Sequence, residues 1–137
     1  MSLVLDTSAT LAWIYPGEQT AAITGVFDQV TAAGAWVPSL WRLEVANSLE
    51  MGVRRGRIDA AFRDATIADF ELLPIQTDPD TEKHAWRATL RLAERHRLTV
   101  YDAAYLELAM RRGLPLASLD RELRVAAKTE SIPLLGE

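Results

Sequence analysis

Cysteine is absent from this 137-residue sequence, and histidine occurs only twice, as His84 and His96. Without cysteine the chain can form neither a disulfide bond nor a thiolate metal site, and this composition is compatible with a reducing cytoplasm. The two imidazoles lie far apart on a segment expected to be helical, so we expect no zinc site. We therefore predict a cytoplasmic protein whose chemistry depends on neither thiolates nor imidazoles.

Long apolar runs are also missing. No stretch reaches the roughly 18 consecutive apolar residues that a membrane-spanning helix requires. The N-terminus has no basic region ahead of an apolar one, so we expect no secretory signal and no membrane association. The chain is nevertheless 49% hydrophobic, which is enough for a core around a sheet. Its length suggests one domain, residues 1–137.

Several common catalytic motifs are absent as well. The sequence has no glycine-rich phosphate loop, and it has neither a nucleophile elbow nor a Cys–His arrangement. A receiver-type phosphoacceptor domain also gathers acids at strand ends, but it needs a lysine at the end of a late strand. The only lysines, Lys83 and Lys128, fall in predicted helices, which makes that class a poor match.

Positive charge is scarce and unevenly distributed. Fifteen basic residues face 19 acidic ones, for a net charge of −4, which is unusual for a nucleic-acid-binding protein. Residues 1–41 contain no lysine or arginine, whereas residues 83–128 hold ten basic residues and five acidic ones. Most of the basic residues are arginines, which suit bidentate phosphate contacts. From charge alone, however, solvated helix faces explain this pattern better.

The hydrophobic pattern alternates between short apolar runs and helical periodicity. It predicts strands at 3–5, 35–37, 114–118 and 132–135, and a weaker one at 74–76. It predicts helices at 8–15, 18–33, 39–55, 59–73, 81–97, 102–113 and 120–128. Pro133 places the last strand at a sheet edge. Strands that alternate with helices predict an α/β fold, a three-layer α/β/α sandwich with a small, mainly parallel sheet.

Three aspartates stand at the predicted junctions between an apolar run and a helix. Asp6 follows residues 3–5, Asp120 follows the strand at 114–118, and Asp102 follows the apolar run that begins at Leu98. Because parallel strands end at one edge of the sheet, we expect these acids to lie near one another. Each could instead cap a helix. Ser8 could cap the first helix, which would leave Asp6 free.

A fourth acid, Glu44, lies in the predicted helix 39–55. Asn47 and Ser48 share its face, which forms a polar stripe on an otherwise apolar helix. Alternatively, Glu44 is an ordinary solvent-exposed residue of this helix. Converging carboxylates without histidine or cysteine favour Mg²⁺ or Mn²⁺. Two such ions can activate water and neutralise the leaving oxygen at a phosphodiester.

Four blocks that contain these acids resemble, in order and spacing, the PIN-domain ribonucleases, and most of all the VapC toxins of prokaryotic toxin–antitoxin pairs. The blocks are Val4–Ala9, Glu44–Leu49, Tyr101–Tyr105 and Leu116–Asp120. The resemblance covers essentially the whole chain. It implies an acidic quartet that holds Mg²⁺ or Mn²⁺ and cleaves RNA, namely Asp6, Glu44, Asp102 and Asp120. It also implies hydroxyl support from Thr7 and Ser118, with Asn47 as a polar neighbour of Glu44.

The same resemblance implies a homodimer and a cognate antitoxin protein that covers the site. We expect part of the apolar surface of helices 18–33 and 39–55 to form such an interface. We also expect Arg42 or Arg121 to contact the RNA backbone, although either could form a surface ion pair instead. The competing hypothesis is a non-catalytic RNA- or protein-binding module that keeps the same fold.

Overall fold

The computed structural model describes residues 1–137. At its centre is a five-stranded sheet in the order β3-β2-β1-β4-β5, in which every neighbouring pair is parallel. The strands are β1 (Leu3–Leu5), β2 (Ala35–Val37), β3 (Ile75–Thr77), β4 (Leu116–Ala117) and β5 (Leu134–Leu135). The predicted parallel sheet is confirmed, as is the edge position of the last strand.

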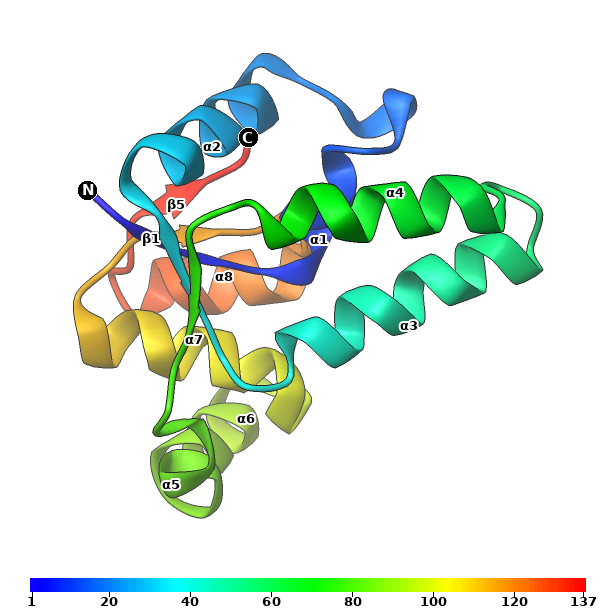
Figure 1. The fold of residues 1–137 in the computed structure, drawn as a ribbon. Coiled ribbons are helices and arrows are strands. Elements are labelled where there is room, and N and C mark those ends of the chain that lie inside the picture. Colours follow the sequence, from blue (N-terminus) through cyan, green and yellow to red (C-terminus); the bar gives the residue numbers. More distant parts are fainter.

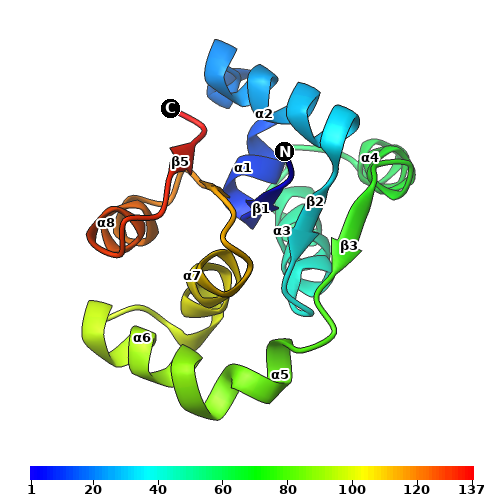
Figure 2. The ribbon, with the colours of Figure 1, turned by 90° about the vertical axis from the view of Figure 1, so that its left-hand side faces the viewer.

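Helices cover both faces of this sheet. They are α1 (Thr7–Ala12), α2 (Ala21–Ala33), α3 (Trp41–Arg54), α4 (Ala60–Glu71), α5 (Thr81–His84), α6 (Leu90–His96), α7 (Val100–Arg112) and α8 (Arg121–Thr129), with a 3-10 turn η1 (Pro16–Glu18) and a π-helical segment η2 (Ala85–Thr89). Figures 1 and 2 show α2 on one side of the sheet and α7 on the other, with α5 and α6 outside α7. This arrangement confirms the three-layer α/β/α fold. None of the helices combines the length and apolar character needed to cross a bilayer.

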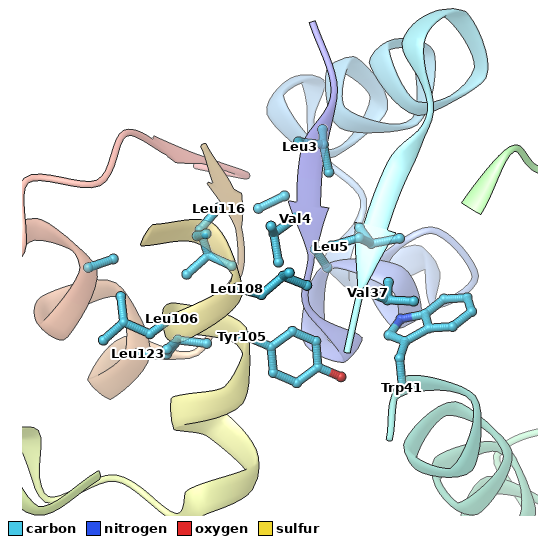
Figure 3. Close-up of a cluster of buried hydrophobic side chains, with 14 of the residues drawn as sticks. Leu3, Val4, Leu5, Val37, Trp41, Tyr105, Leu106, Leu108, Leu116 and Leu123 are labelled. Carbon is cyan, nitrogen blue, oxygen red and sulfur yellow. The ribbon is translucent and has the colours of Figure 1, made fainter. Parts of the chain in front are cut away.

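The buried core lies between β1 and the helices on either side. All three residues of β1 are inaccessible to solvent, as a strand covered on both faces requires. Figure 3 shows them packed with Leu108 and Leu116, and shows Tyr105 at the edge of the same cluster. The hydroxyl oxygen of Tyr105 points away from Leu106 and Leu123. The Tyr105 hydroxyl is thus a polar group at the border of the apolar core.

The strand order places a switch point beside β1. From β1 the chain adds β2 and then β3 on one side, and later places β4 against the opposite side of β1. In open parallel sheets, ligands bind outside the carboxyl ends of the strands at such a point. Asp6 directly follows β1, and Ser118 directly follows β4. The topology therefore brings residues from both ends of the sequence to one edge of the sheet.

Two of the predicted helices start differently from the expectation. The helix predicted from residue 18 is a 3-10 turn followed by α2, and the hydroxyl of Thr20 caps α2 by accepting a hydrogen bond from the Ile23 N–H. Helix α3 starts at Trp41 without a side-chain cap. Ser39, the first residue of the predicted helix, instead donates its backbone N–H to Thr81 Oγ1. Asp59 and Asp120 cap α4 and α8, each by accepting a hydrogen bond from the backbone N–H three residues later.

The segment 81–97 is not the single helix that its periodicity predicts. Helices α5 and α6 are separated by η2, where the backbone of Arg87 leaves helical geometry. The regular helical pattern of side chains therefore stops at this kink. Trp86 and Leu90, on either side of Arg87, are 91% and 50% exposed, whereas Ala93 is buried.

Residues 98–101 form no strand, so the expected strand–helix junction at Asp102 is absent. Helix α7 already begins at Val100 and is capped by Thr99, whose hydroxyl accepts from the Asp102 N–H. Asp102 therefore belongs to the first turn of a helix, not to the end of a strand. A residue near a helix N-terminus can still reach the edge of the sheet, because α7 packs against β1.

Candidate active site

Asp6 is a buried carboxylate at the end of β1. Only 4% of the residue is exposed. Ser8 Oγ and Ser118 Oγ donate to the same oxygen, Oδ2, at 2.6 and 2.8 Å, while Oδ1 accepts no hydrogen bond from the protein. Asp6 occupies the N-cap position of α1 but makes no side-chain capping bond. The carboxylate is therefore held by one oxygen and has the other available for a ligand.

The Ser8 hydroxyl does not cap the first helix, which corrects our sequence interpretation. It donates to Asp6 and accepts from the Leu119 N–H at 2.9 Å. Ser118 has a similar role, because it accepts from the Asp120 N–H at 3.0 Å while it donates to Asp6. Both hydroxyls are thereby oriented by the backbone after β4, and both point their hydrogens at Asp6.

Glu44 is fixed by two hydroxyl groups. Thr7 Oγ1 donates to Glu44 Oε1 at 3.1 Å, and the Tyr105 hydroxyl donates to the same oxygen. The two hydroxyls also lie 3.0 Å from each other. Burial and the neighbouring Glu44 carboxylate raise the pKa of Tyr105 above its usual range, so this phenol remains protonated and acts as a donor. Glu44 Oε2 is left without a protein hydrogen bond.

Asp102 and Asp120 complete the set of acids. Asp120 caps α8 through Oδ1, which accepts from the Leu123 N–H at 2.8 Å. The capping alternative is therefore correct for Asp120, although its second oxygen remains unbonded. Burial raises the pKa of Asp102 above its ordinary value, and the charges of Asp120 and Glu44 raise it further. Asp102 therefore lies within electrostatic reach of both.

The negative charges of the neighbouring acids also act on Asp6. Its burial raises the pKa from 3.8 to about 6; the hydrogen bonds from the two serines oppose this rise, and the charges of Asp102 and Glu44 add to it. No arginine or lysine forms an ion pair with any of the four acids. The four acids repel one another and have no positive side chain to offset that repulsion.

The carboxylates of the four acids are neighbours, but they do not converge on one common ligand position. No three acidic or histidine side chains anywhere in the structure form a group that could already hold a metal ion. The chemistry of the donors nevertheless fits a hard divalent cation, because all are carboxylate oxygens and Asp6 has a free oxygen in a nearly dry position. Mutual repulsion keeps such groups apart until a cation is present.

Three of the predicted site residues lie outside this hydrogen-bonded group. Asn47 is exposed and makes no hydrogen bond to Glu44. Arg42 donates to Thr77 Oγ1 and lies 5.5 Å from the centre of the Trp41 ring. Arg121 is exposed beside Asp120. Neither arginine forms an ion pair, so the surface ion pair that we gave as the alternative to an RNA contact is absent for both.

Sequence reasoning missed the roles of Ser8 and Tyr105. Tyr105 stands three residues after Asp102 on α7, and positions three apart share a helix face, so that spacing was a usable signal. Ser8 stands two residues after Asp6, and nothing in the sequence distinguishes a capping serine from one that turns back to the acid. Only the position of the chain after β4 determines which of the two occurs.

A second buried aspartate was also missed. Asp78, directly after β3, is 1% exposed. It accepts two hydrogen bonds from Arg111, at 3.1 and 2.6 Å, and one from Arg112 at 3.3 Å. Burial alone would raise its pKa, but the hydrogen bonds and charges of the arginines outweigh burial and hold the pKa at about 2. Glu107 supports Arg111 from the preceding helical turn.

Comparison with known proteins gives consistent matches. The family model described as PIN domain matches residues 3–129. Ribonuclease VapC3 of Pyrobaculum aerophilum is 33% identical over 127 residues, which are 90% of this chain and 92% of that protein. The crystal structure of PAE2754 from Pyrobaculum aerophilum has a TM-score of 0.70 at 25% identity and covers 98% of this chain and 83% of that chain.

A more distant structure extends this likeness in fold alone. The crystal structure of FitAcB from Neisseria gonorrhoeae has a TM-score of 0.66 at 14% identity, and the match covers 98% of this chain and 96% of that chain. The family model spans strands β1 to β4 and includes all four acids. Together with a curated relative matched over nine tenths of the sequence, this shows that the chain belongs to the PIN-domain family.

Proposed function

We propose that this protein is a Mg²⁺- or Mn²⁺-dependent endoribonuclease and the toxin of a toxin–antitoxin pair. One observation carries the proposal: Asp6 is buried at the switch point of the sheet, among three other acids, without a cationic partner. Burying a charge is costly unless it is paired, so this arrangement is best explained by a cation that the chain itself does not provide. The name of the relative Ribonuclease VapC3 supports the choice of reaction.

Each residue would have a distinct role in that reaction. Asp6, Glu44, Asp102 and Asp120 would hold the cation, and the hydroxyls of Ser8, Ser118, Thr7 and Tyr105 would fix the first two of these acids. A bound Mg²⁺ or Mn²⁺ would supply an acidified water and neutralise charge on the phosphate. Arg42 and Arg121 would contact the RNA backbone, and Asn47 would remain a polar neighbour near Glu44.

The RNA contacts of the two arginines have their own test. Replacing Arg42 and Arg121 together by alanine should weaken binding of single-stranded RNA. It should also lower the slope of log affinity against log salt by about 0.7 for each lost phosphate contact. An unchanged slope in a filter-binding series would show that neither arginine contacts the backbone.

The partner proteins we propose are a second copy of this chain and an antitoxin. Support comes from a hollow between α3 and α4 that is lined mainly by apolar side chains, including Trp41, Val45, Ile67 and Phe70. Leu43 on α3 and Leu72, directly after α4, are 76% and 84% exposed. We propose this surface as part of an interface, and a strict monomer in sedimentation that also binds no antitoxin would contradict it.

We further propose that residues 1–137 act as one domain. Buried side chains from the first strand, from α7 and from α8 pack in a single core cluster, so no part of the chain has a separate core. Limited proteolysis that released a stable internal fragment would contradict this organisation.

The decisive experiment measures cleavage of a panel of structured RNAs, with and without Mg²⁺ or Mn²⁺. Wild type should cleave only with the metal. Asp6→Asn and Asp102→Asn should each lose about a thousandfold or more in rate, which corresponds to about 4 kcal/mol of barrier, while their circular dichroism stays unchanged. Cleavage at the wild-type rate by either variant would show that the quartet is wrongly assigned. RNA binding without any cleavage by wild type would favour the non-catalytic module.

A further inference from the structure

We propose that the exposed side of the segment from Lys83 to Arg95 is an RNA-docking surface on which Trp86 stacks against a nucleobase. We call it the Trp86 surface; it consists of Lys83, Trp86, Arg87, Leu90, Arg91 and Arg95, all of them exposed. The inference rests on the proposed function, since it takes RNA as the ligand, and it adds a second place where that RNA is held.

The exposure of Trp86 is the first observation. Trp41 is 4% exposed, and Trp13 and Trp36 are partly buried against the core. Trp86 alone projects its ring into solvent, at 91% exposure. An exposed aromatic ring is a binding element for single-stranded nucleic acid, because every base offers a flat face for stacking. Leu90, half exposed one turn later, adds apolar area beside the ring.

The second observation is the charge around that ring. Basic residues recur at every fourth position along the segment, as Lys83, Arg87, Arg91 and Arg95. Only Arg95 is engaged in an ion pair, with Glu130. In contrast, Glu50 holds both Arg54 and Arg63, and buried acids hold the arginines at the end of α7. The positive charges of the Trp86 surface thus remain available for phosphates.

The third observation is the position of the segment along the chain. Helix α6 ends at His96, and after three connecting residues α7 begins at Val100, so its first turn carries Asp102. Both α6 and η2 pack against α7, and Figure 2 shows α5 and α6 along its outer side. Helix α6, from Leu90 to His96, is about 10 Å long, and Trp86 lies four residues before its start. A strand of a few nucleotides could span that length and continue toward the acids.

A protein partner fits this surface less well. Its apolar part consists of only two side chains, and unpaired positive charges surround them. The apolar hollows between α1, α2, α3 and α4 lie elsewhere and offer a larger area for a protein. A protein interface is usually depleted of charge at its centre, whereas a stacking ring within a basic stripe is the arrangement expected for a nucleic acid.

The test measures binding of a labelled single-stranded oligoribonucleotide by fluorescence anisotropy, in a chelator so that no cleavage occurs. Trp86→Ala should weaken binding about 5- to 100-fold, the range of one lost base stack. Val125→Ala removes an exposed apolar side chain from α8, where it is 62% exposed, and should have no effect. Arg87→Gln/Arg91→Gln should weaken binding and lower the salt slope by about 1.4, as expected for two lost phosphate contacts. The charge-matched control Arg54→Gln/Arg55→Gln should do neither.

Tryptophan fluorescence gives a readout that a protein interface would not change. RNA should quench the emission of wild type, since the exposed ring stacks on a base, and Trp86→Phe should remove that quenching while it retains most of the affinity. If Trp86→Ala binds RNA as wild type does, the inference is overturned. The same holds if the substitution instead turns a dimer into a monomer in sedimentation. Cleavage by wild type is scored separately, so a protein that binds RNA through Trp86 without cutting it would overturn only the proposed reaction.

Discussion

Asp6 and Asp78 are both buried aspartates that directly follow strands of the same parallel sheet, yet their environments are opposite. Asp78 receives hydrogen bonds from two arginines, and these hold its pKa at about 2. Asp6 receives only serine hydroxyls and lies near other acids, and its pKa is raised to about 6. The chain neutralises one of these charges with its own residues and provides no positive side chain for the other.

Under the proposed function, this contrast separates a structural acid, Asp78, from a metal-binding one, Asp6. Burial is almost the same for both aspartates, so burial alone does not identify a site. The distinguishing feature is whether the fold supplies the opposite charge. A buried charge without such a partner costs free energy, and perturbed acids of this kind concentrate at functional sites. The predictions below test whether the two aspartates differ in the way that their partners indicate.

The largest expected effect is on stability. Asp78→Asn leaves Arg111 and Arg112 without their buried partner and should lower the free energy of unfolding by about 3–4 kcal/mol. Asp6→Asn relieves repulsion among acids and should raise that free energy in a chelator at pH 7.5. Urea unfolding measures both. Asp80→Asn, two residues away and without a side-chain capping bond, is the matched control and should change stability by less than about 0.5 kcal/mol. If Asp6→Asn were less stable than wild type, Asp6 would be a stabilising acid like Asp78, and the proposed difference between the two would be wrong.

The pH dependence should also have opposite signs at the two positions. The pKa of Asp6 is raised in the folded protein, so its contribution to stability is complete below pH 3.8 and is lost as pH rises through about 6. The advantage of Asp6→Asn over wild type should therefore grow by about 2.4 kcal/mol between pH 4 and pH 7, since the whole shift is worth about 3 kcal/mol at about 1.4 kcal/mol per pKa unit. Unfolding titrations in a chelator across this range measure that advantage.

For Asp78 the pKa is lowered, so its contribution is present above pH 3.8 and is lost as pH falls toward 2. The advantage of wild type over Asp78→Asn should shrink in that acid range and stay constant above it. A wild-type advantage that shrinks as pH rises from 4 to 7 would mean that Asp78 is not the arginine-neutralised group described here.

Metal should discriminate between the same two positions. A cation that binds only the folded protein stabilises it by about 2.7 kcal/mol at a concentration one hundred times its Kd. Thermal melts in Mn²⁺ and in chelator should show this stabilisation in wild type and in Asp78→Asn, and should not show it in Asp6→Asn. Below pH 5 the stabilisation should disappear, because protons replace the metal on the acids. An unchanged metal response in Asp6→Asn would place the cation elsewhere.

The smallest effect concerns the hydroxyl that holds Glu44. Tyr105→Phe removes one of the two donors to Glu44 Oε1 and should weaken Mn²⁺ binding about 10-fold, as loss of a group that orients a metal ligand does. Tyr101→Phe removes an exposed hydroxyl from the same helix and should leave the affinity unchanged. Calorimetric titration of both variants measures this, and equal affinities would assign Tyr105 to the core alone.

Much of the arrangement around Asp6 could be inferred from the sequence. A short apolar run that stops at an acid before a helical pattern fixes Asp6 at the end of a strand, and the alternation of strands and helices fixes the direction of that strand. Glu44 could be recognised because it interrupts an apolar helix. These inferences succeed because they depend on local pattern and on the single rule that parallel strands end on the same side.

The features that could not be inferred depend on contacts between distant residues. Asp78 and Arg111 are 33 residues apart and meet only in the tertiary fold, where the last turn of α7 reaches the residue after β3. Trp86 is exposed in a segment where the backbone of Arg87 leaves helical geometry, and no residue in that stretch signals such a kink. Asp102 was assigned to a strand end because the run from Leu98 is apolar, but the cap at Thr99 takes precedence.

The hydrogen bond from Ser118 to Asp6 links residues that are 112 positions apart, and this distance determines when the site can form during translation. Strand β1 is synthesised more than a hundred residues before its neighbour β4, and pairing of strands so far apart in sequence is slow. When the ribosome has released only the first hundred of these residues, Asp6 and Glu44 are present while Ser118 and Asp120 are not. If the protein cuts RNA, a nascent chain that still lacks β4 is therefore harmless to the message that encodes it.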